Sequence, residues 1–113
     1  MAIRIRPMRG SDYDAMIALF RVCGMNLKTK GRDSLRSFTA QLRRNADSYL
    51  GAFDGDRLVG TVLGTHDTRK GWINRLAVDP RYRRRTIAAR LVRRCELVLR
   101  KKGFEMFAAL IEP

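Results

Sequence analysis

The feature that most constrains the fold is a long amphipathic segment between two apolar runs in the last third of the chain. From Thr86 to Lys102, apolar side chains recur at helical spacing and basic side chains fill many of the other positions. The flanking runs Trp72–Val78 and Phe104–Ile111 have the apolar character of strands. A strand, a helix and a second strand in this order predict two parallel strands joined by a right-handed crossover.

The residues before this unit predict five more elements. They are a strand over Ile3–Arg6, a helix that begins with Ser11 and Asp14 as a capping box and stops at Gly24, a helix that opens at Asp33, and two strands over Ser48–Phe53 and Arg57–Thr65. The turn Asp54-Gly55-Asp56 makes the last two a hairpin, since Gly55 accepts a positive φ. The whole order, β-α-α-β-β-β-α-β, predicts an α/β fold with a mixed sheet.

Composition limits the class of protein. With 113 residues, 45% hydrophobic and 31% charged, the chain fits one soluble globular domain over residues 1–113. The amino terminus lacks a signal-peptide stretch and no apolar run approaches the ~18 residues of a membrane span, so we expect a cytoplasmic protein without a membrane partner. One histidine and two distant cysteines, Cys23 and Cys95, lack zinc-ligand spacing, so no metal is expected.

The positive charge is high and unevenly distributed. The formal net charge is +13, and residues 68–113 hold 13 of the 24 basic residues but 4 of the 11 acidic ones. Such a balance suits a nucleic acid, an anionic surface or a small polyanionic ligand. Aromatic residues do not interleave with the basic ones as they do in base-stacking platforms. A nucleic acid is therefore not the expected partner, although a basic nucleic-acid-binding module remains an alternative.

The junction between the strand Trp72–Val78 and the following helix carries the chemistry. Free N–H groups at a helix start collect at the positive end of the helix dipole, where they bind anions. Arg83, Arg84 and Arg85 stand at this place, and the small residue Ala88 follows within the first helical turn. This arrangement predicts a cradle for a diphosphate.

The same stretch resembles motif A of the GNAT superfamily of acyl-CoA-dependent N-acyltransferases. That motif reads Gln or Arg, two residues, Gly, one residue, then Gly or Ala. Here Arg83 takes the first place, Thr86 stands where the glycine is expected, and Ala88 takes the last place. A threonine can adopt helical φ and ψ, so we expect the fold to tolerate it while its side chain crowds the phosphates.

The resemblance implies transfer of an acetyl group from acetyl-CoA to a primary amine, by direct attack of the amine on the thioester. The acceptor would be a small molecule or a peptide; the resemblance does not identify it or a catalytic residue, and Asp67, His66 and Glu112 are weak candidates for the base. The implied cofactor-binding residues are the strand Leu76, Ala77 and Val78 and the motif Arg83, Arg84, Arg85, Thr86, Ile87 and Ala88.

The resemblance covers the amino-terminal part of the family's domain. A helix and two strands that family members carry after this point do not follow Pro113. We therefore expect an acetyltransferase domain that is incomplete at its carboxyl terminus, and an inactive truncated fragment remains an alternative. An open sheet edge left by the missing strands would favour a homodimer.

Overall fold

The computed structural model describes residues 2–67, 69–83 and 86–109, with only the backbone of Ala109. Within these residues the elements follow the predicted order. They are β1 (Ile3–Pro7), the 3₁₀ turn η1 (Gly10–Asp12), α1 (Tyr13–Val22), α2 (Leu35–Arg44), β2 (Tyr49–Asp54), β3 (Arg57–His66), β4 (Gly71–Val78), the 3₁₀ turn η2 (Pro80–Tyr82), α3 (Ile87–Lys101) and β5 (Phe107–Ala109).

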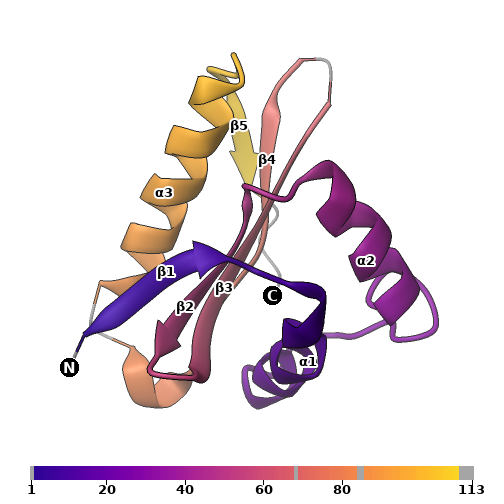
Figure 1. Cartoon of the computed structure of the whole chain (residues 1–113), viewed down its shortest axis with the longest axis vertical. Helices are drawn as coiled ribbons and strands as arrows, with labels where there is room; N and C mark the ends of the chain where they lie inside the picture. Colours follow the sequence, from indigo (N-terminus) through magenta and orange to yellow (C-terminus); the bar gives the residue numbers. More distant parts are fainter. Residues whose placement is uncertain (1, 68, 84–85, 110–113) are drawn as a thin grey trace.

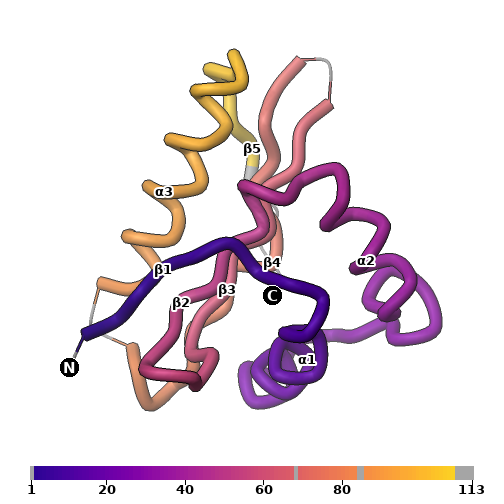
Figure 2. Tube along the Cα trace, in the orientation of Figure 1, coloured from indigo at the N-terminus to yellow at the C-terminus, as the bar shows by residue number. Residues whose placement is uncertain are grey.

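One mixed sheet forms the middle layer of the molecule (Figure 1). Its strands lie in the order β1-β2-β3-β4-β5, antiparallel up to β4, while β5 pairs with β4 in parallel. Helices α1 and α2 cover one face, and α3 runs along the other (Figure 2). This confirms the α/β fold with a mixed sheet, including the parallel pair at the end. The described part of β5 is shorter than predicted, and residues 110 and 111 lie outside the described residues.

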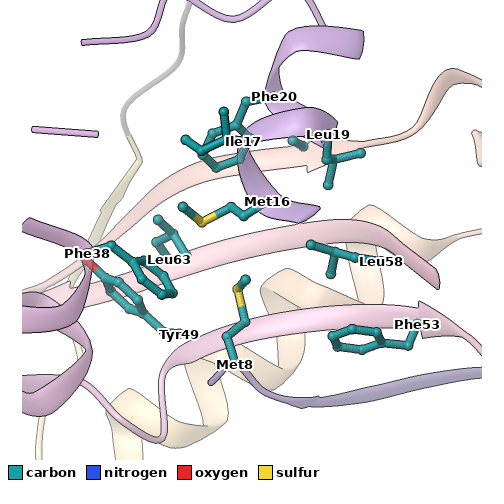
Figure 3. Packing of buried hydrophobic residues seen from close by; sticks show 11 residues of the cluster. Met8, Met16, Ile17, Leu19, Phe20, Phe38, Tyr49, Phe53, Leu58 and Leu63 are labelled. Carbon is teal, nitrogen blue, oxygen red and sulfur yellow. The ribbon is translucent and has the colours of Figure 1, made fainter. Parts of the chain in front are cut away.

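Each face of the sheet has its own apolar core. On the α1–α2 face, the side chains of α1 meet those of β2 and β3, with Phe38 of α2 against Tyr49 (Figure 3). On the other face, Leu91, Cys95 and Leu99 of α3 are fully buried against the central strands. The spacing of four residues places these three side chains on one face of the helix, as the sequence predicts.

Two helix starts differ from the prediction. Ser11 does not cap α1; instead a 3₁₀ turn precedes the helix, and the carboxylate of Asp12 accepts a hydrogen bond from the N–H of Arg9 at 2.7 Å. Helix α2 begins at Leu35, because the Ser34 hydroxyl accepts the N–H of Ser37 and caps it. Asp33, predicted to open this helix, is buried and has another partner.

That partner is Arg75, which lies in a bulge of β4. The register between β3 and β4 shifts after Thr61, and Arg75 adopts a left-handed φ of 51°. The Thr61 hydroxyl donates a hydrogen bond to the Arg75 carbonyl at 2.9 Å. Through the bulge, the Arg75 side chain reaches Asp33, whose two carboxylate oxygens lie 2.7 and 2.6 Å from one guanidinium nitrogen. This ion pair ties the middle of β4 to the segment between α1 and α2.

Gly64 of β3 lies directly against Cys95 of α3, which leaves no room for a side chain. A Cβ atom there would overlap the Cys95 sulfur and lie 3.0 Å from the Ser48 carbonyl oxygen. We expect Gly64→Ala to lower the free energy of unfolding by about 1–3 kcal/mol, because the buried surroundings must shift to admit the methyl group. Urea denaturation measures the change. The control Gly10→Ala has open space around its new Cβ, and a loss as large as that of Gly64→Ala would contradict the explanation.

Candidate functional site

The turn between β4 and α3 is fixed by side chains that the sequence analysis did not assign. The buried carboxylate of Asp79 accepts a hydrogen bond from the Arg81 N–H at 2.9 Å. It also forms an ion pair with the Arg81 guanidinium at 3.1 Å. The Tyr82 hydroxyl donates to Asp54 at 2.6 Å and so fastens the turn to the β2–β3 hairpin. Because the Arg81 guanidinium already pairs with Asp79, the candidates for binding an external anion are the later arginines Arg83, Arg84 and Arg85.

Thr86 does not have the conformation that the sequence analysis expected. It precedes α3 in the left-handed region, with φ 60° and ψ 13°, and not in the helical region. Glycine adopts this left-handed conformation without strain, which explains why a glycine suits the position. A β-branched residue in this region carries strain, because its Cβ crowds the backbone carbonyl.

The start of α3 presents its free amides to a cavity. The first helical hydrogen bond runs from Arg90 N–H to the Thr86 carbonyl at 3.0 Å, so the N–H groups of Ile87, Ala88 and Ala89 have no intrahelical partner. A cavity of about 300 Å³ lies at this helix start. Its lining consists of Val78, Tyr82, Arg83, Thr86, Ile87, Ala88 and Ala89.

A second hollow continues from this cavity along α3 towards β4. It has a volume of about 440 Å³ and shares Ala88 and Ala89 with the first, and Leu76, Val92, Arg93 and Glu96 complete its lining. The two shared residues have short side chains, so neither fills the space between the hollows with a long side chain. The cavity at the helix start and the second hollow together form a groove from the start of α3 to the outer edge of β4, which we call the α3 groove.

The outer edge of β4 is open beside the α3 groove. In the described part of the chain, β5 pairs only with Gly71–Ile73, and Leu76 is 42% exposed. Asp79 donates its N–H to Val59 of β3, and backbone direction alternates along a strand, so the N–H and carbonyl of Val78 point to the outer edge. The Val78 carbonyl accepts the Cys23 thiol at 3.4 Å. The Val78 N–H can donate a hydrogen bond to an acceptor of an extended ligand.

A separate polar cavity lies on the α1–α2 face, next to the β4 bulge. It has a volume of about 280 Å³ and is lined by Arg32, Asp33, Ser37, Gln41, Tyr49, Leu63, Thr65, Asn74 and Arg75. Burial raises the pKa of the Tyr49 hydroxyl to about 12, so this group is neutral near pH 7 and cannot serve as a ready base. The bulge places Asn74 and Arg75 on the same face, where both line this cavity.

The family follows from the comparison of sequences. The sequence model of the acetyltransferase (GNAT) family matches residues 13–113, which include the bulged strand, the turn and the helix just described. The chain belongs to this family. Acetyltransferases of Pectobacterium atrosepticum and Photorhabdus laumondii are each 32% identical over 101 residues. These matches cover 89% of this chain in both cases, and 70% and 69% of the two relatives.

Solved GNAT structures have the same fold. The PaiA N-acetyltransferase of Thermoplasma acidophilum, solved in complex with coenzyme A, superposes with a TM-score of 0.84 at 22% identity. The match covers 98% of this chain and 80% of that one. Ard1 of Thermoplasma volcanium gives a TM-score of 0.82 at 16% identity, over 96% of this chain and 71% of that one. At these identities the likeness concerns the fold alone.

The structure brings most of the predicted cofactor-binding residues of this GNAT chain to one groove. Leu76, Val78, Arg83 and Thr86–Ala88 line it, whereas the Ala77 side chain is buried on the α1–α2 face. Arg84 and Arg85 lie outside the described residues. The sequence analysis missed the cavity on the other face, since its polar residues are spread over four segments and no local pattern connects them.

Of the three candidate bases, the two in the described part of the chain, Asp67 and His66, line neither the α3 groove nor the polar cavity. Asp67 accepts the N–H groups of Lys70 and Arg69 and the Trp72 indole, and these bonds lower the pKa of its carboxyl to about 2. His66 stacks on Phe104 at the exposed end of β3, and Glu112 lies outside the described residues.

In residues 2–67, 69–83 and 86–109, no cluster of three or more His, Cys, Asp or Glu side chains could hold a metal ion. Over the same ranges, no helix combines the length and the apolar character that a membrane crossing requires.

Proposed function

We propose that this GNAT chain is an acetyl-CoA-dependent N-acetyltransferase that acts on a primary amine. The observation that carries the proposal is the α3 groove, whose two hollows share Ala88 and Ala89 and lie between the amides of Ile87–Ala89 and the open edge of β4. Its dimensions and chemistry suit a donor with a diphosphate at one end and an extended amide-containing arm. A relative in fold solved with coenzyme A supports this class of donor.

Each part of the groove has one role in this proposal. The N–H groups of Ile87 and Ala88 bind the diphosphate, because the helix dipole adds positive potential there. Arg83, with Arg84 and Arg85, supplies charge-assisted hydrogen bonds to the phosphates. The backbone of Leu76–Val78 binds the pantetheine arm as an added strand would, and an N–H of this strand polarises the thioester carbonyl.

The amine reaches the thioester from the opposite face of the sheet in this proposal. The polar cavity beside Asn74 and Arg75 adjoins β4 at the bulge, on the face away from α3. The amine nitrogen, once deprotonated, attacks the thioester carbonyl carbon, the carbon–sulfur bond breaks, and the thiolate leaving group takes up a proton. A lysine-like ammonium has a pKa of ~10.4, so the amine must first lose a proton, and the base remains unassigned.

The cytoplasm is the compartment we propose for this reaction. Both cysteines are free thiols, with Cys95 fully buried, and free thiols persist in the reducing cytoplasm.

Thermal unfolding in the presence of acetyl-CoA tests the donor assignment. A ligand that binds only the folded chain raises its stability, by about 2.7 kcal/mol at a concentration 100 times Kd. We expect acetyl-CoA and CoA to raise Tm by several degrees, while adenosine without phosphates has little effect. A Tm that does not respond to acetyl-CoA would contradict the proposed function.

The left-handed conformation of Thr86 yields a further prediction. We expect Thr86→Gly to raise the free energy of unfolding by about 0.5–1 kcal/mol, since relief of left-handed strain exceeds the added entropy of glycine in the unfolded chain. It should also lower the Kd of acetyl-CoA, because it removes bulk beside the phosphates. Calorimetric titration and urea denaturation measure the two effects. Thr86→Ala is the matched control, because its Cβ retains the strain, and an equal gain there would refute the explanation.

A further inference from the structure

The outward side of α3 carries a strong and uniform positive charge. Five basic residues and one exposed leucine occupy it, and we call this set the outer face of α3. Its members are Arg90, Arg93, Arg94, Leu97, Arg100 and Lys101. At 100° per residue they fall within an arc of about 120°, and they extend about 16 Å along the helix axis. The face points away from the sheet, since Leu91, Cys95 and Leu99 bury the opposite side (Figure 1).

The charges of this face are not neutralised within the described residues. No carboxylate lies within 4.0 Å of a charged nitrogen of these five side chains there, although other basic side chains, such as Arg6 and Lys102, have such partners. Arg90 donates to the Ile3 carbonyl and Arg100 stacks on Phe107, and both contacts leave the positive charge in place. The acidic residue of the helix, Glu96, lines the α3 groove instead. Five uncompensated cations on one face favour a partner with regularly spaced negative charges.

The surroundings of the charges distinguish between classes of polyanion. A helix that inserts into a bilayer surface needs a wide apolar side. The apolar side of α3 is buried against the sheet, and Leu97 is the exposed apolar member of the outer face. The face offers no aromatic ring on which single-stranded bases could stack. A convex helix enters the major groove of B-DNA, which is about 12 Å wide, whereas the major groove of duplex RNA is too narrow.

We propose that the outer face of α3 binds duplex DNA through its phosphate backbone, without sequence preference. Arginine contacts to phosphates position a protein on DNA and need no aromatic side chains. The absence of interleaved aromatics in the sequence therefore argues against base stacking but not against this mode of binding. The inference is independent of acetyl transfer, because it rests on side chains that point away from the α3 groove, with Arg93 at the boundary between the two surfaces.

Fluorescence anisotropy with a labelled 20-base-pair DNA duplex tests this proposal. Five phosphate contacts predict that log K falls with log salt concentration with a slope of about −4.5. The variant Arg90→Gln/Arg94→Gln/Lys101→Gln should bind at least about tenfold more weakly at low salt, with a slope closer to −2. The control Arg36→Gln/Arg43→Gln/Arg44→Gln removes the same charge from exposed positions on α2, across the sheet, and should bind within about twofold of the natural chain.

Three results would overturn the proposal. One is no binding of the duplex at low salt. Another is an equal loss of affinity in the α2 and α3 variants, which would make binding a property of net charge alone. The third is equal or tighter binding of duplex RNA, single-stranded DNA or polyglutamate, because α3 would then not distinguish the major groove of B-DNA from other polyanions. Circular dichroism and acetyl-CoA titration of both variants verify that fold and donor site are intact, since none of the six residues lies in the α3 groove.

Discussion

Replacing Arg75 with alanine is expected to lower the free energy of unfolding by about 3–5 kcal/mol. The substitution removes the buried guanidinium partner of Asp33, since both side chains of this pair are less than a tenth exposed. The Asp33 carboxylate then keeps the Lys28 N–H at 2.8 Å and the more exposed Arg32 guanidinium at 3.5 Å. A chain of this size has about 5–15 kcal/mol of stability, so the change is large. Urea denaturation measures it, and Arg75→Lys, which keeps a positive charge, should lose less.

A double-mutant cycle separates the ion pair from other consequences of the change. Because Asp33→Asn removes the charge that Arg75 neutralises, the two substitutions together should cost clearly less than the sum of the single ones. Arg6→Ala serves as a comparison: its pair with Asp12 is more exposed, with N and O 3.0 Å apart, and should contribute about 1 kcal/mol or less. Additive effects at Asp33 and Arg75 would show that the pair does not hold β4 to the α1–α2 segment.

Reversing the charge at Arg83 and Arg85 is expected to abolish acetyl-CoA binding. Hydrogen bonds to charged groups contribute about 1.5–3 kcal/mol each, so Arg83→Glu/Arg85→Glu should raise Kd by about 100-fold or more. Arg83 is exposed at the end of η2, so its replacement should leave the fold intact. Calorimetric titration measures the affinity, and circular dichroism checks the secondary structure.

The control for this variant is Arg36→Glu/Arg43→Glu. It introduces the same change in net charge on α2, across the sheet from the α3 groove, and should alter the affinity by about threefold or less. If both variants lose affinity equally, long-range electrostatics and not phosphate contact explains the effect. If Arg83→Glu/Arg85→Glu still binds acetyl-CoA tightly, the assignment of the cradle is wrong.

The order of elements could be predicted because each local pattern agrees with the tertiary structure. Helix α3 buries the residues that its period selects, and Gly55 adopts the positive φ that the hairpin turn requires. The parallel pairing of β4 with β5 followed from the order strand, helix, strand, which is typical of a crossover connection, and not from any residue preference. The period of a helix, the residues of a turn and the order of elements all depend on residues close together in the chain, so they can be predicted from the sequence.

The rest depends on contacts between distant residues. The sequence predicts that Asp33 begins a helix. In the structure its side chain instead forms a buried ion pair with Arg75, which lies 42 positions later in the chain. Thr86 takes a left-handed conformation at the start of α3, against the preference of a β-branched residue, and no local pattern indicates it. The cavity beside Asn74 exists because of a bulge that no local pattern indicates. The expected homodimer and the expected incompleteness of the domain stay predictions.

The most direct test of the central claim is an NMR titration of the isotope-labelled chain with CoA, read at individual backbone amides. We expect saturable shifts at the amides of Leu76, Val78 and Ile87–Ala89, which line the α3 groove, and unchanged resonances along α2. Saturable binding that shifts the amides of α2 while these amides stay unchanged would contradict the assignment of the α3 groove as the CoA site.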